Sequence, residues 1–263
     1  MSGKDAYRKA NQGRELDRLD EQHELFNRYI GDKITYAPLE NPKKILEVGA
    51  IQAAKQYPDA EVVAADMAPL PERPLPSNIK FQQLNVFDPF PFEKESFDVV
   101  HMRFVLMHIP KPDDIVRRLT ELVRPGGWLI IEDMDQPPKV IANAPSLSET
   151  FRTMRNFMDS RGVCPTVGSS LSQWFVETGA FNEVSVRHLS IPLSPDFSDS
   201  VFATLGRGMR LSMKRFLGED SKDGQLAAIG LTPELQQRFK DEIEQSGWKY
   251  DIQLYFVWSQ KRA

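Results

Sequence analysis

The feature that most constrains the fold is a succession of short apolar segments separated by loops or helical segments. Strands are predicted over residues 44–49, 61–67, 79–86, 97–104 and 128–134. An amphipathic helix is predicted over residues 111–123, in which Ile115, Leu119 and Leu122 or Val123 share one face. Strands that are apolar almost throughout are typical of a parallel sheet covered on both faces. The pattern therefore predicts an α/β fold with a doubly wound, mostly parallel sheet.

The second half of the chain extends this pattern. Helices are predicted over residues 146–162, 169–181, 200–217 and 232–247, and strands over residues 182–193 and 251–261. Thr232 is the expected N-cap of the last helix, because a proline follows it at the first helical position. Two late strands beside the first five predict a seven-stranded sheet.

Composition restricts the class of protein. The chain has 263 residues, of which 41% are hydrophobic and 27% charged, as in a globular protein. A net charge of −4 gives no general electrostatic case for a nucleic-acid partner. Cys164 is the single cysteine, so no intrachain disulfide can form, which fits a reducing compartment. No apolar run approaches the ~20 residues that span a bilayer. We expect no membrane partner and a cytoplasmic location, with the nucleus as the alternative.

Polar residues gather where the predicted strands end. They are Glu47–Gly49, Asp66–Met67, Asn85–Val86, His101–Arg103 and Glu132–Asp135. In open parallel sheets, ligands bind outside the carboxyl ends of the strands, where the strand order reverses. The sequence therefore predicts a ligand site at this edge of the sheet.

Four stretches together resemble the class I S-adenosylmethionine-dependent methyltransferases. They are "ILEVGA" (45–50), "EVVAADM" (61–67), "FDVVHMRFVLMHI" (97–109) and "LVRPGGWLIIED" (122–133). Together with "RELDRLDEQHELF" (14–26), these stretches are similar in sequence to the fungal branch of that family associated with secondary metabolism. The resemblance implies a Rossmann-like methyltransferase fold. It also implies an N-terminal helical lid over residues 1–40 and an α/β domain over 41–263, with a partly helical acceptor-side insertion over 137–220.

The resemblance further implies a site for S-adenosylmethionine. Asp66 would accept hydrogen bonds from the ribose hydroxyls, and Met67 would lie against the adenine. Asn85 stands where the family often has an acid, and its amide can still accept and donate hydrogen bonds. Glu47 would position the methionine end indirectly, and Gly49 would let the backbone approach the ligand. The other expected cofactor residues are Ala50, Val86, Met102 and Arg103.

Several of these residues have structural alternatives. Arg103 could pair with the cofactor carboxylate, with an acidic substrate, or with Glu47 or Asp133 in a structural role. His108 and His23 are candidate general bases for removing a proton from the acceptor as the methyl group leaves sulfur. Either histidine could instead be packed as an ordinary part of the fold. No metal-ligand spacing is present, so no metal is expected.

The turn after the first strand departs from the family pattern. The family has Gly-x-Gly-x-Gly there, whereas "EVGA" runs directly into "IQAAKQYP", a helix predicted over residues 51–57. Relative to the family pattern, about six residues are absent, including the glycines that would wrap the methionine moiety. Either the sequence lacks residues that the protein has, or the deletion is real and weakens cofactor binding.

The predicted function is methyl transfer to a small organic acceptor of the secondary-metabolite kind. The alternative is a methyltransferase fold with a degenerate cofactor loop. Such a protein would act as a non-methylating cyclase or isomerase, or as a regulatory binding protein. A homodimer or a regulatory protein partner stays open, and the acceptor and the methylated atom are not encoded in any motif.

Overall fold

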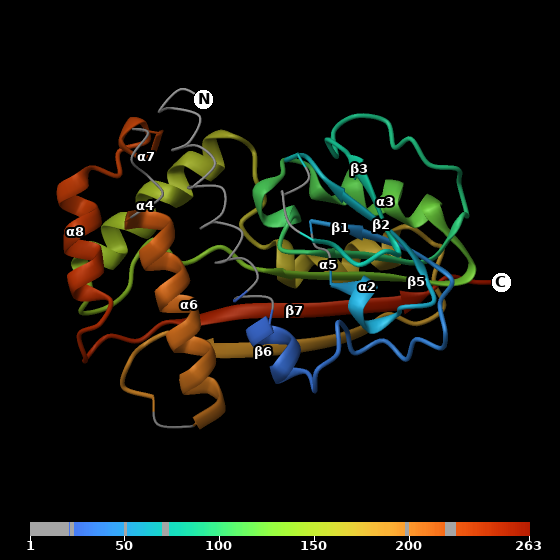
Figure 1. Ribbon diagram of the computed structural model, residues 1–263. Coiled ribbons are helices and arrows are strands. Elements are labelled where there is room, and N and C mark those ends of the chain that lie inside the picture. Colours follow the sequence, from blue (N-terminus) through green and yellow to red (C-terminus); the bar gives the residue numbers. More distant parts are fainter. Residues whose placement is uncertain (1–20, 22–23, 50–51, 70–73, 198–199, 219–224) are drawn as a thin grey trace, which may run out of the picture. The chain divides into compact units, whose positions relative to one another are not determined.

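The protein is described by a computed structural model that covers residues 21, 24–49, 52–69, 74–197, 200–218 and 225–263 (Figure 1). The chain forms two compact units. The sheet unit comprises residues 33–136, 161–189 and 253–263, and the helical unit comprises the described residues of 1–32, 137–160 and 190–252. The lid predicted over residues 1–40 lies partly outside the described residues and stays a prediction.

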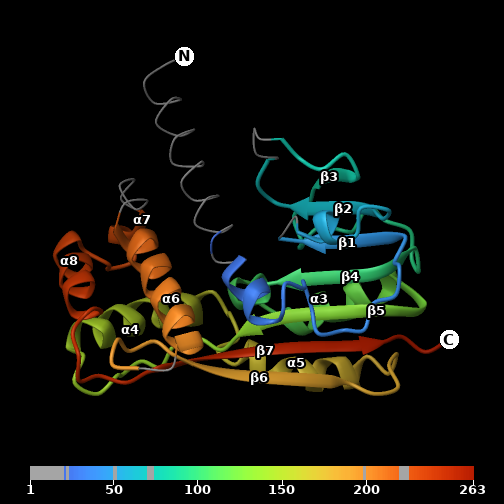
Figure 2. The same cartoon turned by 60° about the horizontal axis from the view of Figure 1, so that its bottom comes forward.

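Seven strands form one sheet, as the sequence predicts. They are β1 (Lys44–Val48), β2 (Glu61–Asp66), β3 (Ile79–Gln83), β4 (Phe97–Arg103), β5 (Val123–Met134), β6 (Ser185–Pro192) and β7 (Asp251–Gln260). Their order is β3-β2-β1-β4-β5-β7-β6 (Figure 2). The first five strands pair in parallel, and β7 pairs antiparallel to β5. The strand order reverses between β1 and β4, so their carboxyl ends mark the expected ligand edge.

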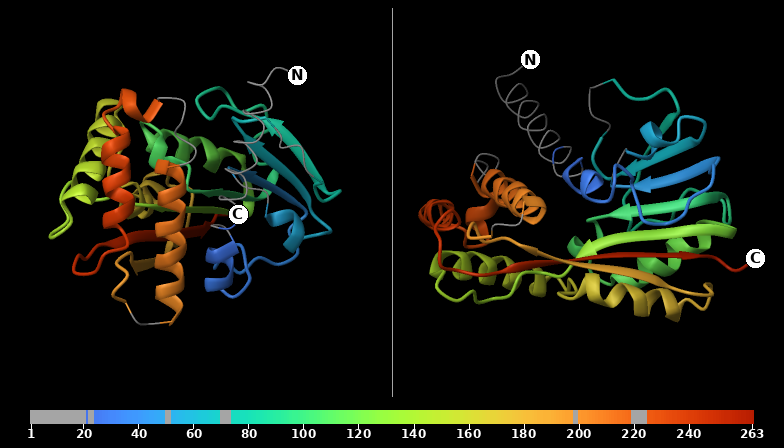
Figure 3. Two further views of the ribbon diagram at one scale, coloured as in Figure 1. Left: turned by 60° about the vertical axis from the view of Figure 1, so that its left-hand side comes forward. Right: turned by 90° about the horizontal axis from the view of Figure 1, so that it is seen from below.

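Helical elements separate most of these strands along the chain, although β2, β3 and β4 follow one another directly. They are α2 (Ala53–Gln56), the 3₁₀ helix η1 (Leu106–His108), α3 (Pro112–Leu122), α4 (Pro145–Ser160), α5 (Val167–Glu177), α6 (Ser200–Gly218), α7 (Gln225–Ala228) and α8 (Pro233–Glu242). By colour, Figure 3 (right) shows the same succession of strands, from β3 to β6. Thr232 is the N-cap of α8, as predicted, and its hydroxyl accepts a hydrogen bond from the Leu235 amide at 3.3 Å.

Both faces of the central strands are buried, which explains why those strands are apolar almost throughout. Leu46, Val100 and Leu129 face one core together with residues of α3 and α5. Ile45, Val99 and Ile130 face a second core with residues of α2 and the segment before β1. The side chains alternate strictly between the two faces, so neighbouring positions on β1, β4 and β5 belong to different cores.

The connection between β1 and β2 is short, and hydrogen bonds from a single side chain hold its far end. Helix α2 is a single turn, shorter than the helix predicted over residues 51–57. The side-chain amide of Asn78 donates hydrogen bonds to the carbonyls of Ala54, Tyr57 and Ala60 at 3.0 to 3.2 Å. The connection comprises residues 49–60, and this length is about the dozen residues that a parallel crossover needs. Asn78 is the residue that fastens this crossover, and its role was not predicted.

The start of β5 differs from the prediction. The sequence indicates a helix stop over "RPGG" and a strand from Trp128, whereas β5 begins at Val123. Val123 pairs with Phe97 and Trp128 pairs with Val99, so residues 124–127 form an irregular bulge in the strand. Gly126 has a φ of +71° there, which supplies the expected left-handed residue inside a strand.

The helical unit packs through aromatic and glycine contacts. The rings of Phe151 in α4 and Phe239 in α8 meet edge to face, with their centroids 6.0 Å apart. Residues 24–29 are helical, and the Leu25 side chain lies against Gly208 of α6, where a Cβ atom would come within 2.4 Å. Among the described residues, no helix combines the length and the apolar character needed to cross a bilayer.

Candidate functional site

The turn at Gly49 lies at the carboxyl end of β1, where the strand order reverses. The Gly49 amide donates a hydrogen bond to the Ala65 carbonyl of β2 at 2.9 Å. Its φ is +78°, and a Cβ atom at this position would lie 2.5 Å from Cγ2 of Val105, which follows β4. Gly49 is therefore required both by its backbone conformation and by close packing between β1 and the β4 end. Ala50, the next predicted cofactor residue, lies outside the described residues.

Asp66 ends β2 with an exposed carboxylate. Its Oδ1 atom accepts a hydrogen bond from the Ala68 amide at 2.8 Å, which fixes the turn after the strand. Gln83 steadies the same turn by donating to the Met67 carbonyl at 3.0 Å. The Met67 side chain is 69% exposed, so it is not core filling. An exposed carboxylate and an exposed thioether thus stand side by side at the ligand edge.

Asn85 and Val86 form the turn after β3. The Asn85 Oδ1 atom accepts a hydrogen bond from the Phe87 amide at 3.2 Å. Arg118 of α3 donates to the Val86 carbonyl at 2.7 Å. Helix α3 therefore holds this turn in place, which leaves the amide nitrogen of Asn85 as the group best suited to contact a ligand.

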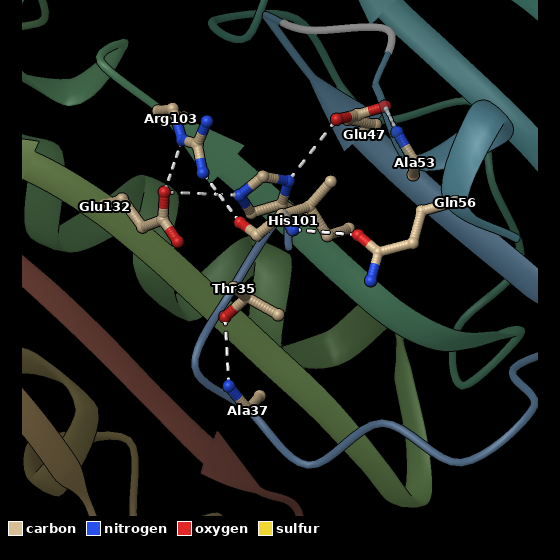
Figure 4. A network of polar contacts seen from close by, with 9 residues as sticks. Thr35, Ala37, Glu47, Ala53, Gln56, His101, Arg103 and Glu132 are labelled. Atoms are coloured by element: carbon tan, nitrogen blue, oxygen red, sulfur yellow. Dashed lines mark hydrogen bonds and ion pairs between the residues drawn. The ribbon is translucent and has the colours of Figure 1, made fainter. Parts of the chain in front are cut away.

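Four charged side chains form a buried network across β1, β4 and β5 (Figure 4). Glu47, His101, Arg103 and Glu132 are each 2% exposed or less. The His101 ring lies between the two carboxylates, with Nδ1 at 3.5 Å from Glu47 Oε1 and Nε2 at 3.8 Å from Glu132 Oε2. Arg103 pairs with Glu132 through its Nε atom and donates from Nη2 to the Ile34 carbonyl at 2.6 Å.

The surroundings of the network favour the charged form of each of its titratable members. Burial alone would raise the pKa of Glu47 and Glu132, but His101 outweighs it for Glu47, and Arg103 and His101 do so for Glu132. Both carboxyl pKa values are therefore lowered. Burial would lower the pKa of His101, but the two carboxylates raise it above its ordinary value. Two negative and two positive charges then balance each other, which is how a buried charged cluster can be tolerated.

Asp133 points to the other face of the sheet from Glu132. Its carboxylate accepts hydrogen bonds from the amides of Met134 at 2.9 Å and Met107 at 3.2 Å. Burial raises its pKa to about 7, because these amide bonds only partly offset the loss of solvent. Asp133 therefore holds the start of η1 against the end of β5.

The remaining predicted residues occupy varied positions. Met102 is fully buried in the core beneath α3 and α5. His108 is exposed in η1, and His23 lies outside the described residues. The structural alternative for Arg103 named Glu47 or Asp133 as its partner, but the observed partner is Glu132. The reason is register, because Arg103 and Glu132 are directly opposite across β4 and β5.

Sequence analysis placed Glu132 at a polar strand end but gave it no role. The signal that could have found it is alternation, since His101 and Arg103 share one face of β4. A carboxylate opposite them on β5 would be needed to balance their charge. No group of three or more His, Cys, Asp or Glu side chains within the described ranges is arranged to hold a metal ion.

The sheet order and the polar carboxyl edge define a Rossmann-like protein of the methyltransferase type. Residues 21–183 match the family model described as "Methyltransferase domain". Methyltransferase str2 of Strobilurus tenacellus is 39% identical over 259 residues, and methyltransferase str3 of the same fungus is 42% identical over 260. Each alignment covers 95% of this chain and 94% of the relative.

A solved structure shows the same fold. The chain resembles Haemonchus contortus phosphoethanolamine N-methyltransferase 2, with a TM-score of 0.55 and 16% identity. That alignment covers 93% of this chain but only 53% of the nematode enzyme, so the chain spans about half the length of that structure. The chain belongs to the methyltransferase family, within the class I S-adenosylmethionine-dependent enzymes that its motifs resemble.

Proposed function

We propose that this protein transfers a methyl group from S-adenosylmethionine to a small organic acceptor of the secondary-metabolite kind. The observation that carries the proposal is the exposed Asp66 carboxylate at the carboxyl end of β2, beside the turn at Gly49. A carboxylate in this position suits the paired hydroxyls of a ribose. The full-length relatedness to fungal methyltransferases favours this function over a non-methylating cyclase or a regulatory protein.

The residues present fit the adenosyl half of the cofactor. Asp66 would accept from the ribose, Met67 would lie beside the adenine, and Asn85 with Val86 would meet its polar edge. Gly49 and Ala50 would approach the methionine end, and Glu47 would act on it indirectly through α2. The cofactor supplies an electrophilic methyl group on its sulfonium sulfur.

The chain's own contribution to methyl transfer would be positioning and the exclusion of water. Met102 and Arg103 are both buried, so in this proposal they support the end of β4 and do not contact the cofactor directly. His108 or His23 would take the acceptor proton where the acceptor needs a base. The polar, exposed setting of His108 suits that role. The same proposal has the enzyme act in the cytoplasm, with a small molecule as its partner.

Calorimetry with S-adenosylhomocysteine and S-adenosylmethionine tests the proposal. Asp66→Ala should weaken binding of either ligand by about tenfold to a hundredfold, the equivalent of a lost hydrogen bond to a charged group. Asp59→Ala is the matched control, because Asp59 is an exposed carboxylate just before β2, at the opposite edge of the sheet. If the wild type binds the ligands and Asp66→Ala binds them with the same affinity, the assigned site is wrong. No heat at millimolar ligand would refute the function itself.

A further inference from the structure

The buried network continues beyond its four charged side chains and closes on itself. Its members, in order around the ring, are Glu47, Ala53, Gln56, Ile34, Arg103, Glu132 and His101, and the backbone of α2 joins Ala53 to Gln56. Figure 4 shows this ring spanning the ends of three strands, helix α2 and the segment that precedes β1. Because the side chains of the ring share partners, loss of one of them disturbs the contacts of its neighbours.

Glu47 connects the ring to the turn after β1. Helix α2 has no side-chain cap from Gln52, and the Glu47 Oε2 atom instead accepts the Ala53 amide at 2.9 Å. The Gln52 amide also hydrogen bonds to this carboxylate. A carboxylate from the preceding strand thus takes the place of an N-cap. The position of Glu47 therefore fixes where α2 begins, immediately after the turn that starts at Gly49.

The ring also holds the segment before β1. Gln56 accepts a hydrogen bond from the Ile34 amide at 2.8 Å, and Arg103 donates to the Ile34 carbonyl at 2.6 Å. The backbone N–H and C=O of Ile34 are therefore satisfied by side chains from α2 and from β4. Thr35 is buried next to it, and its hydroxyl accepts from the Ala37 amide at 3.2 Å. This segment cannot shift without disturbing both α2 and the end of β4.

His101 is the member whose protonation decides whether the ring is complete. A neutral imidazole has one N–H, so it can donate toward Glu47 or toward Glu132 but not to both. Only the protonated imidazole presents an N–H to both carboxylates at once, across separations of 3.5 and 3.8 Å. The charged groups that face it are Glu47 from β1, Glu132 from β5 and Arg103 from β4 itself. The segment over 33–37 and helix α2 meet the ring through amides and a hydroxyl, and their charged residues, Lys33 and Lys55, are exposed.

We propose that His101 is a positioning residue for the methyl-donor cofactor. In its protonated form it holds Glu47 on the first amides of α2 and so fixes where that helix starts after Gly49. Loss of the proton releases Glu47, loosens the start of α2 and weakens cofactor binding. This inference rests on the cofactor function proposed above and adds a pH dependence to it.

Two substitutions separate the roles of the two nitrogens of the His101 imidazole. His101→Asn keeps a donor near the position of Nδ1, which faces Glu47 at 3.5 Å. His101→Gln keeps a donor near the position of Nε2, which faces Glu132 at 3.8 Å. The affinity for S-adenosylhomocysteine at pH 6 should fall about tenfold in His101→Gln and less in His101→Asn, within the usual range of coupling between sites. His188→Asn is the control, because His188 is exposed and bonds to Gln253 on the sheet edge.

The pH profile of binding provides a readout that a purely structural role would not move. The ratio of the wild-type affinity to the affinity of His101→Asn should fall as the pH rises through the raised pKa of His101. Because both proteins bind the same ligand, this ratio cancels any titration of the ligand. By linkage, S-adenosylhomocysteine should raise the pKa of the His101 ring in the wild type by about one unit, the equivalent of tenfold. NMR of the labelled histidine rings measures this directly and needs no variant that might fail to fold.

The outcomes distinguish a failure of the role inferred for His101 from a failure of the proposed methyltransferase function. An unchanged ring pKa on binding, or a wild-type to His101→Asn ratio that is flat with pH, overturns the role of His101 and leaves the methyltransferase proposal standing. Equal affinities of His101→Gln and the wild type at pH 6 do the same. No binding of S-adenosylhomocysteine by the wild type at any pH overturns both proposals. Unaltered behaviour of His188→Asn is expected in every case.

Discussion

Gly49 shows how a single residue can be fixed by two independent constraints. Its φ of +78° disfavours any residue with a Cβ atom, and that atom would also meet Val105 at 2.5 Å. Gly49→Ala should therefore lower the free energy of unfolding by about 2–4 kcal/mol, combining backbone strain with overpacking. Urea unfolding measures this change.

Two further variants separate the two constraints. Gly179 has a φ of +67° but nothing within 4 Å of its would-be Cβ atom, so Gly179→Ala should cost only the backbone part, about 1–2 kcal/mol. Adding Val105→Ala to Gly49→Ala should recover the steric part by removing the clashing methyl group. An equal loss for Gly49→Ala and Gly179→Ala would contradict the steric argument.

A residue of the candidate site could be predicted from the sequence only where its own position in a strand or turn indicates its role. Asp66, Met67 and Gly49 lie at strand ends that the sequence marks, and each is found at the expected edge. The partnership of Arg103 with Glu132 depends on the register of two strands joined through α3, which no local pattern specifies. Asn78 likewise acts on a crossover that ends 18 residues before it.

At the scale of elements, η1 depends on a carboxylate from a neighbouring strand. Asp133 of β5 accepts the amide of Met107 at 3.2 Å, and the amides of Leu106 and Val105 also bond to it. Its pKa is raised from 3.8 to about 7, so the folded protein holds this proton more tightly than the unfolded chain. The resulting stabilisation is complete below pH 3.8 and is lost as the pH rises to about 7.

Asp133→Asn removes this titration and tests it. Its free energy of unfolding, relative to the wild type, should improve by about 2–3 kcal/mol between pH 5 and pH 8, at up to about 1.4 kcal/mol per pH unit. The amide nitrogen of asparagine will meet amide donors, which adds a cost that does not vary with pH. The His101 titration is common to both proteins and cancels. A difference for Asp133→Asn that is flat with pH would show that Asp133 ionises normally.

Elements were predicted best where hydrophobic periodicity and length agree. The strands of the parallel sheet and helices α3, α6 and α8 lie close to their predicted positions. Helix α2 was predicted too long, because a run of helix-forming residues is interrupted by tertiary contacts that turn the chain at Tyr57 toward β2. The start of β5 was missed because a proline and two glycines usually end structure, whereas here they form a bulge between paired residues.

For the molecule as a whole, the short turn after β1 determines how the cofactor's two halves should share the binding energy. Residues 49–52 contain one glycine, whereas the adenosyl half is served by Asp66 and by the two turns after β2 and β3. We therefore expect adenosine to retain most of the affinity of S-adenosylhomocysteine, with dissociation constants that differ by less than about tenfold.

Thermal unfolding across a range of ligand concentrations tests this expectation, because a ligand that binds only the folded state raises stability by an amount set by its concentration relative to Kd. Methionine alone should produce no shift, and Asp66→Ala should reduce the shifts of adenosine and S-adenosylhomocysteine equally. A preference for S-adenosylhomocysteine of about a hundredfold or more would mean that the turn grips the methionine end despite its length. In that case the shortened sequence between Gly49 and α2 would be a working cofactor turn rather than a degenerate one.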